Sequence, residues 1–389
     1  MEFKKYKMED ISTFSQGKQV EIENQYTKQF DNMKRFLRII DFTNPNEPLR
    51  YVEDYGNRYY VTKEDLVMIR YGSQTCGKVV IGKEGIIANN MFKINLDNSI
   101  VLNRYAYYFL KQDLVYNYLR SSQNSSTMPS INFGILNKLE IEIPNLDNQR
   151  KIVKVLCNID QKIESNNKIN NNLYEMSLSI FNDFLNNNDA ELVKLEDCVE
   201  KINTGADAIQ RAPIVDYDTG VRCIRIGDMT NSRDYHNWGF TKMNDKDYDN
   251  YKLIKNDIVI TRTAVNGLTY IITDEERVVC NNGNIRLRVN NKYNPLYIYL
   301  NTKTKDFRNY IDRINGETSV RPNMKVEYFT SYEIKKYSPE EQNKICNVIK
   351  PLFNKINENK KENYNLEQLR DTLLPKLMNG EIDLDNIEL

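Results

Sequence analysis

The chain has 389 residues, and its 54 lysines and arginines are balanced by 54 aspartates and glutamates, so the formal net charge is zero. This balance argues against a protein that coats nucleic acid along its whole surface, but it leaves room for one basic face. No apolar run approaches the roughly 20 residues that span a bilayer, and the charged start at residues 1–10 does not fit a signal peptide, so we expect a cytoplasmic protein without a membrane partner.

Residues 1–145 carry mixed strand and helix signals. Short β-branched runs at Lys78–Ile81 and Gly85–Ala88 are bounded by turn-forming residues and predict strands. Residues Asn103–Arg120 place apolar side chains at helical spacing. A short strand-like run then ends at Pro144, a residue type that suits the start of a helix. This segment is predicted to be an α+β domain.

Residues 146–187 predict a long helix. Apolar residues recur there in steps of three and four, and no Pro or Gly interrupts Gln149–Leu185. The recurring positions are Ile152, Val155, Ile159, Ile163, Leu173, Met176, Ile180 and Phe184. At two positions where this apolar seam should continue, the chain has Asn166 and Asn170 instead.

Residues 188–337 repeat the first globular segment. At an offset of 187, Arg38–Asn44 matches Arg225–Asn231, and at an offset of 192 Asn89-Asn90 matches Asn281-Asn282. Strands are predicted at Asp257–Thr261 and Tyr270–Thr273, and Pro295–Ile311 has the helical texture of its counterpart in the first copy. The chain is therefore a tandem duplication.

Residues 338–389 repeat the long helix and end in an acidic tail, which we interpret as a solvated end. At an offset of 193 the apolar seam recurs, together with both asparagines, Asn359 and Asn363. Two such seams in one chain predict a coiled coil, in which seam asparagines fix the register because a shift would leave their amides against hydrocarbon. The alternative is that these asparagines lie at exposed edges of the seam.

Together these patterns predict an α+β protein with two tandem-repeated globular domains, separated by two long helices that form an antiparallel coiled coil. The antiparallel direction follows if the two copies are related by a pseudo-two-fold axis. The predicted domains are residues 1–145, 146–187, 188–337 and 338–389.

Catalytic and metal-binding motifs were not found. The sequence has no GxxxxGK[ST] phosphate loop, no GxSxG elbow and no HExxH pair. Its six cysteines lie far apart without a CxxC pair, and His236 is the single histidine, so a zinc site is not expected. We predict no catalytic residue, no metal and no cofactor in this chain.

Two pairs of polar loops instead suggest recognition of DNA. The loop after a predicted strand in each copy combines Arg, hydroxyls, amides and Gly, which suit guanine, adenine and phosphate contacts. Its candidate residues are Arg70, Tyr71, Ser73, Gln74, Lys78, Arg262, Thr263 and Asn266. A second polar pair contributes Asn124, Ser125, Ser126, Thr127, Thr318, Ser319, Arg321 and Asn323. The alternative is that all four are ordinary turns.

Several ordered motifs occur twice. Ile143-Pro144 precedes Asn148–Ile152, and Ser338-Pro339 opens the run that reaches Ile345. The strand before each recognition loop begins Asp65-Leu66-Val67 or Asp257-Ile258-Val259, and the last helix closes with Leu377–Ile382. In this order the motifs resemble the specificity subunit of type I restriction-modification systems over nearly the whole chain.

This resemblance implies that each globular segment is a target recognition domain that reads one half of an asymmetric, bipartite double-stranded DNA sequence. It also implies that the coiled coil sets the separation of the half-sites and docks two methyltransferase subunits. Those subunits would bind S-adenosylmethionine, and a restriction and translocase subunit would join for cleavage. Two other functions stay open on the residues alone: a coiled-coil scaffold that bridges proteins, and a stand-alone DNA methyltransferase or nuclease.

Overall fold

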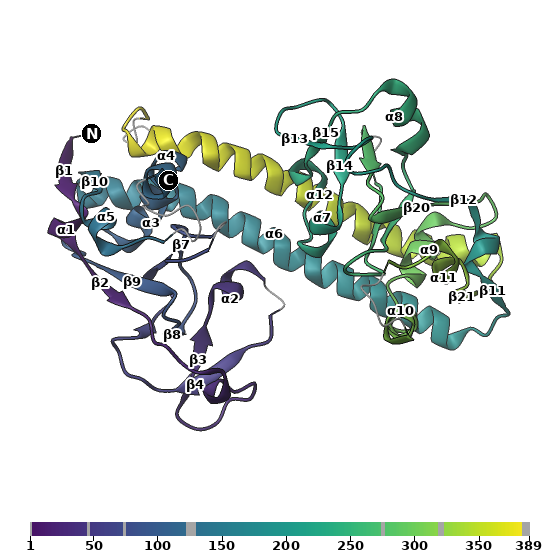
Figure 1. Ribbon diagram of the computed structural model, residues 1–389, viewed down its shortest axis with the longest axis horizontal. Helices are drawn as coiled ribbons and strands as arrows, with labels where there is room; N and C mark the ends of the chain where they lie inside the picture. The colour runs from purple at the N-terminus through teal and green to yellow at the C-terminus, as the bar shows by residue number, and fades with distance from the viewer. Residues whose placement is uncertain are drawn as a thin grey trace. The chain divides into compact units, whose positions relative to one another are not determined.

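The computed structural model describes residues 2–44, 47–72, 75–121, 130–273, 277–317 and 323–382. The chain forms two compact units (Figure 1). Unit 1 consists of Met1–Lys162 and Leu366–Leu389, and unit 2 consists of Ile163–Asn365. Two long helices, α6 (Leu146–Asn187) and α12 (Pro339–Met378), contribute residues to both units. Among the described residues, each helix is too short or too polar to cross a membrane.

Unit 1 contains two four-stranded sheets and a strand pair. The first sheet has the order β2 (Ser12–Gln16), β9 (Met91–Leu96), β6 (Leu66–Ile69) and β7 (Val79–Val80), all antiparallel. The second has the order β4 (Arg50–Glu53), β3 (Met33–Leu37), β8 (Gly85–Ile87) and β5 (Tyr60–Val61), in which β3 and β8 run parallel. The strand pair is β1 (Phe3–Lys7) with β10 (Glu140–Pro144).

The helices of unit 1 are α1 (Met8–Ile11), α2 (Ile39–Thr43), α3 (Asn103–Lys111), α4 (Asp113–Ser121) and α5 (Phe133–Asn137). Most of them contribute to the core shared by the first sheet and the ends of the long helices, whereas α2 packs on the second sheet. One core joins Phe92 of the sheet to Tyr105 of α3, Ile152 of α6 and Leu377 of α12, all of which are fully or almost fully buried. The long helices are thus part of this unit's hydrophobic core.

Unit 2 repeats this plan. Its first sheet has the order β12 (Val199–Thr204), β20 (Asn284–Val289), β17 (Ile258–Thr261) and β18 (Thr269–Ile271). Its second sheet has the order β13 (Ile214–Val215), β15 (Phe240–Thr241), β14 (Arg222–Ile224), β19 (Val278–Cys280) and β16 (Lys252–Leu253), in which β14 and β19 run parallel. The strand pair is β11 (Leu192–Lys194) with β21 (Glu333–Lys335).

The α-helices of unit 2 are α7 (Ile226–Thr230), α8 (Asp245–Tyr251), α9 (Pro295–Asn301), α10 (Lys305–Glu317) and α11 (Val326–Thr330). They lie at most of the places that correspond to the helices of unit 1, with a 3₁₀ turn at Leu195–Cys198 in place of α1 and with α8 as an addition. The core joins Ile258 of the sheet to Tyr297 of α9, Phe181 of α6 and Ile349 of α12. The α+β duplication predicted from the sequence is therefore confirmed.

Both continuous helices predicted after the sheet strands are interrupted. Residues Asn103–Arg120 form α3 and α4, which are separated at Gln112, whose backbone is extended (φ −60°, ψ 136°). The break changes which face is buried, so Leu114 is 84% exposed. The counterpart Pro295–Ile311 is likewise divided between α9 and α10.

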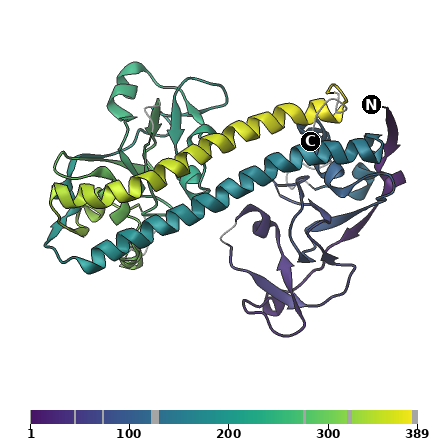
Figure 2. The ribbon, with the colours of Figure 1, turned by 180° about the vertical axis from the view of Figure 1, so that it is seen from behind.

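The two long helices run antiparallel in each unit. In unit 2 α12 lies alongside α6 (Figure 2), and Asn166 Nδ2 donates to Asn363 Oδ1 at 2.9 Å while Asn359 Nδ2 donates to Asn170 Oδ1 at 2.8 Å. All four asparagines are buried, so they do not lie at exposed edges. In unit 1 Arg370 of α12 donates to Asp160 of α6 at 2.9 Å. The antiparallel coiled coil is confirmed.

Part of the apolar seam was assigned to the wrong residues. Met176 is 52% exposed, and Val348, the seam position that matches Val155 at the offset of 193, is 55% exposed, whereas Ser177 and Phe181 are fully buried. The reason is that the helices pack on their own globular domains as well as on each other: the ring of Phe181 contacts that of Tyr297 in α9 at 5.5 Å. The buried face is thus broader than a two-helix seam.

A buried glutamine fixes the start of each long helix. Gln149 Oε1 accepts from the N–H of Leu102, and its Nε2 donates to the carbonyls of Ile100 and Pro144. Gln342 repeats this arrangement: it accepts from the N–H of Asn294 and donates to a carbonyl just before α12. Both side chains are fully buried.

We expect Gln149→Leu to lower the free energy of unfolding by about 2 kcal/mol, because it leaves one N–H and two carbonyls buried without partners. The control is Gln161→Leu on the exposed face of the same helix, which should change stability by less than about 0.5 kcal/mol. Urea denaturation of both variants measures the difference. Equal stability of the two variants would contradict this role for Gln149.

Candidate nucleic-acid interface

The two polar segments predicted in the first copy meet in unit 1. The N–H of Arg70, directly after β6, donates to the carbonyl of Asn90 at 2.8 Å, and its own carbonyl accepts from the N–H of Ile131 at 3.0 Å. Tyr71 forms an antiparallel bridge with Ser130. The loop after β6 and the segment that leads into α5 are therefore held side by side. Four predicted positions of this segment, and two of the loop, lie outside the described residues: Ser73, Gln74, Asn124, Ser125, Ser126 and Thr127.

Unit 2 repeats this contact bond for bond. The N–H of Arg262 donates to the carbonyl of Gly283 at 2.9 Å, and its carbonyl accepts from the N–H of Met324 at 2.8 Å. Thr263 forms an antiparallel bridge with Asn323, as Tyr71 does with Ser130. Three predicted residues of the second segment lie outside the described residues: Thr318, Ser319 and Arg321.

The two arginine side chains differ in how they are held. The Arg70 guanidinium lies over the ring of Tyr71 at 5.0 Å, and among the described residues its buried Nε has no hydrogen-bond partner. The Nε of Arg262 donates to the carbonyl of Met324 at 3.0 Å. The Arg262 side chain is thus tied to the neighbouring segment by a backbone acceptor, whereas Arg70 rests on an aromatic face.

A glycine with positive φ closes each loop. The N–H of Gly77 (φ 84°) donates to the last residue of β6, and the N–H of Gly267 (φ 79°) donates to the last residue of β17. Gly267 also lies against Ile311, which a Cβ would approach to 2.9 Å. Lys78, just after the first loop, is exposed to solvent. The second loop is thus a tight hairpin, and the described end of the first loop is closed in the same way.

Asn266 is buried, unlike the two residues before it in the second loop. Its side chain is 2% exposed, and its Nδ2 donates to Asn315 Oδ1 on α10 at 2.8 Å. Its backbone carbonyl accepts from Arg308 on the same helix. This placement suits a residue that holds the loop on α10.

Contacts between basic side chains and tyrosines were not predicted from the sequence. In unit 1 Lys18 Nζ lies 4.9 Å from the ring centre of Tyr55 and 5.5 Å from that of Tyr59. In unit 2 Arg211 donates to the hydroxyl of Tyr251 at 2.9 Å. The run at residues 55–60, in which one arginine lies among three tyrosines, was the available signal, and such pairs suit phosphate and base contacts.

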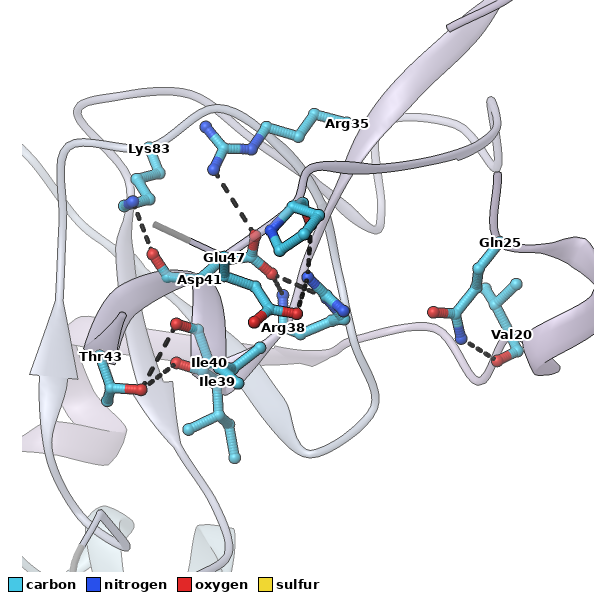
Figure 3. A network of polar contacts seen from close by, with 11 residues as sticks. Val20, Gln25, Arg35, Arg38, Ile39, Ile40, Asp41, Thr43, Glu47 and Lys83 are labelled. Carbon is cyan, nitrogen blue, oxygen red and sulfur yellow. Dashed lines mark hydrogen bonds and ion pairs between the residues drawn. The ribbon is translucent and has the colours of Figure 1, made fainter. Parts of the chain in front are cut away.

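The repeated Arg–x–x–Asp motif is structural (Figure 3). Asp41 is buried and accepts from both the backbone N–H and the Nε of Arg38, at 2.8 and 2.9 Å. Lys83 Nζ donates to the Asp41 carbonyl at 2.6 Å, and burial, with the nearby charge of Arg35, lowers the pKa of Lys83. Asp228 likewise caps its helix by accepting from the N–H of Arg225.

The described residues contain no group of three or more side chains that could hold a metal ion. All six cysteines are free thiols. Burial raises the pKa of Cys223 and of Cys346 to about 12, which keeps these thiols protonated and unreactive near neutral pH. His236 stacks on Tyr364 of α12, with ring centres 3.9 Å apart, so it packs the domain onto the helix.

Comparison with known proteins supports the sequence resemblance. The family model described as "Type I restriction modification DNA specificity domain" matches residues 1–175 and again residues 187–368. The MjaIX specificity subunit of a type I restriction enzyme from Methanocaldococcus jannaschii is 26% identical over 80% of this chain and 76% of its own length. The MjaVIII specificity subunit of the same organism is 22% identical over 85% and 82%.

A solved structure shares the fold. The S subunit of a type I restriction-modification system from M. genitalium aligns with a TM-score of 0.55 over 97% of this chain and 96% of its own, at 18% sequence identity. At this identity the likeness concerns the fold alone. It extends over both globular units and both long helices.

Proposed function

The chain belongs to the family of type I restriction-modification DNA specificity domains, of which it carries two copies, and from this premise we propose that each unit reads one half of an asymmetric bipartite DNA target. As a specificity subunit the chain recognises DNA and is not itself the catalyst. Because the two copies differ in sequence, the two half-sites should differ as well.

The observation that carries this proposal is the repeated junction of polar segments. In both units the arginine directly after β6 or β17 is hydrogen-bonded through its backbone to two segments. One is the turn before the neighbouring strand in the sheet, β9 or β20, and the other is the segment before the short helix α5 or α11. A duplicated junction that is held by backbone hydrogen bonds and carries polar side chains that differ between the two units suits base contacts, which need fixed geometry. Arg70 and Arg262 are the proposed base or phosphate contacts at its centre.

We further propose that this chain works with two methyltransferase subunits, which would bind S-adenosylmethionine, and with a restriction and translocase subunit. The outer faces of α6 and α12 are the proposed docking surface for the methyltransferases. The buried asparagine pairs would fix the register of these helices, and the register would set the spacing of the half-sites. A chromosomal target would put this work in the cytoplasm.

The direct test is footprinting of the chain assembled with its methyltransferase subunits. We expect two protected half-sites with unread base pairs between them. Arg70→Ala should weaken one half-site and Arg262→Ala the other, each by about 1–3 kcal/mol if the arginine contacts a base. Arg104→Ala, which removes an exposed ion pair with Glu64, is the control and should leave both half-sites protected.

One continuous footprint, or no footprint, would overturn the proposal. Sequence-specific binding that survives both arginine changes would remove the loops from the interface and favour a protein-bridging scaffold. Tight binding of S-adenosylmethionine by the isolated chain would instead favour a stand-alone methyltransferase.

A further inference from the structure

A close backbone crossing joins the two sheets of each unit. After β2 the chain passes so near the end of β8 that a Cβ on Gly17 would lie 2.2 Å from the carbonyl oxygen of Ala88. In unit 2, a Cβ on Gly205 would lie 2.2 Å from the carbonyl oxygen of Cys280. Only glycine allows this approach. In unit 1 the crossing holds the turn after β8 against the residues that follow β2. In unit 2 it holds the turn after β19 against the residues that follow β12.

Backbone hydrogen bonds at this crossing define which residues of the two turns are equivalent. The N–H of Asn89 donates to the carbonyl of Lys18, and the N–H of Asn282 donates to the carbonyl of Ala206. The sequence alignment that paired Asn89 with Asn281 is therefore wrong by one residue. Asn281 faces inward, where its Oδ1 accepts from Asn284. Asn89 and Asn282 occupy the same structural position.

Both asparagine amides are oriented by an acceptor at a second equivalent position. In unit 1 Asn89 Nδ2 donates to Gln19 Oε1, whose own Nε2 donates to Glu21 at 3.4 Å. In unit 2 Asn282 Nδ2 donates to Asp207 Oδ2 at 3.3 Å. Although Gln19 and Asp207 differ chemically, each offers an oxygen to the same N–H.

The acceptors are themselves fixed. Asp207 Oδ1 accepts from the backbone N–H groups of Gln210 and Ile209, and these hydrogen bonds lower the pKa of its carboxyl group. The Asp207 carboxylate therefore stays ionised near neutral pH and can only accept hydrogen bonds. In unit 1 the Glu21 carboxylate directs the Gln19 N–H₂ toward itself, so the Gln19 oxygen faces Asn89. The nitrogen side of each asparagine amide is thereby turned toward its acceptor.

What remains of each amide is one N–H and the carbonyl oxygen. Among the described residues no donor reaches Asn89 Oδ1 or Asn282 Oδ1, and neither oxygen is buried without a partner. Asn89 is half-buried and Asn282 is exposed. A donor beside an acceptor on one planar group is complementary to N7 and N6 of adenine in the major groove.

We propose that Asn89 and Asn282 are the base-reading amides of the two units, each accepting from N6 and donating to N7 of one adenine, with Gln19 and Asp207 as their positioning residues. This inference rests on the proposed function. The amides adjoin the arginine loops directly, since the residue after each asparagine accepts the backbone hydrogen bond of Arg70 or Arg262. Lys18, which precedes Gln19, lies at the same crossing and suits a phosphate contact.

The test uses the chain in complex with its methyltransferase subunits and duplexes that differ from the target at one base pair. Asn89→Ala should lose about ten- to a hundredfold in affinity for the intact target and should lose discrimination at a single adenine of one half-site. Asn282→Ala should do so in the other half-site. With 7-deazaadenine at that position, wild type should weaken while the matching Ala variant should not weaken further.

Two controls separate base reading from other effects. Asn95→Ala, on β9 in unit 1, removes an asparagine bonded to Thr13 and Ser15 and should keep all base preferences. Lys18→Ala should weaken every duplex by the same factor. If both asparagine variants lose affinity equally on all duplexes, or keep every preference, the inference is overturned. If wild type itself shows no sequence preference, the proposed function fails instead.

The positioning role has its own readout. Gln19→Glu combined with Glu21→Gln keeps an oxygen toward Asn89 and a hydrogen bond between positions 19 and 21, and should retain discrimination at the adenine. Gln19→Lys removes the acceptor and should lose it, while the rest of the half-site is read normally. Equal discrimination by the two Gln19 variants would contradict positioning by this residue.

Discussion

Gly205→Ala is expected to lower the free energy of unfolding by about 3 kcal/mol or more, because the added methyl group would be forced against backbone rather than a movable side chain. A Cβ at this position lies 2.2 Å from the carbonyl oxygen of Cys280 and 2.4 Å from that of Asn281. Neither oxygen can move away without straining the hydrogen bond that it accepts, from the N–H of Ala206 for Cys280 and from the N–H of Asn284 for Asn281. Urea denaturation measures the loss.

A matched glycine in the same unit provides the control. Gly227 lies in α7 with nothing within 4 Å of its added Cβ, so Gly227→Ala should be neutral or stabilising by about 0.5–1 kcal/mol. If Gly205→Ala unfolds at the same urea concentration as Gly227→Ala, the backbone at the crossing can move enough to accept the methyl group. The turn that carries Asn282 would then not be rigid.

A paired insertion of four residues, after Lys162 in α6 and before Leu366 in α12, is expected to lengthen the tolerated spacer between half-sites by about one to two base pairs. Four helical residues add about 6 Å of rise and about 40° of rotation. One base pair adds about 3.4 Å of rise. Each half-site should be read as before, because both insertions fall at the boundary between the two units and leave the contacts within each unit unchanged. Methylome sequencing in a host that expresses the intact system measures both quantities.

The insertion must be made in both helices because the asparagines pair across them. An insertion after Lys162 alone shifts one helix against the other, so that the amide pairs and the hydrogen bond from Arg370 to Asp160 cannot all be kept. We expect that single insertion to lower stability rather than lengthen the spacer. An unchanged spacer after the paired insertion would refute the proposal that the helices set the distance.

The periodic parts of the fold could be predicted from sequence, and the parts that depend on tertiary packing could not. The seam periodicity predicted both long helices, since three- and four-residue steps describe one helical face. It placed Met176 on that face, whereas Ser177 is buried there instead, because the globular core adds a second packing partner. The break at Gln112 has no Pro or Gly to mark it.

The sequence predicted the loops of the candidate site but not how its side chains are held. The repeat brought the Arg70 and Arg262 loops to attention, and the structure joins each to the second polar segment of its copy. The orienting of Asn89 by Gln19 could not be foreseen, because these residues are 70 positions apart and meet only through the crossing at Gly17. The one-residue error in aligning Asn89 hid its match with Asn282.

The two hydrogen-bonded asparagine pairs between the long helices form an amide ladder, and this ladder also indicates how the gene arose. Asn166 donates to Asn363 just as Asn359 donates to Asn170. The two donors occupy equivalent positions of the repeat, and so do the two acceptors. Two identical copies of the α6 stretch, set antiparallel, would make both bonds. A single-repeat ancestor could therefore have formed a homodimer with this same ladder. Fusion of two such genes would preserve the ladder while letting each globular half evolve its own target.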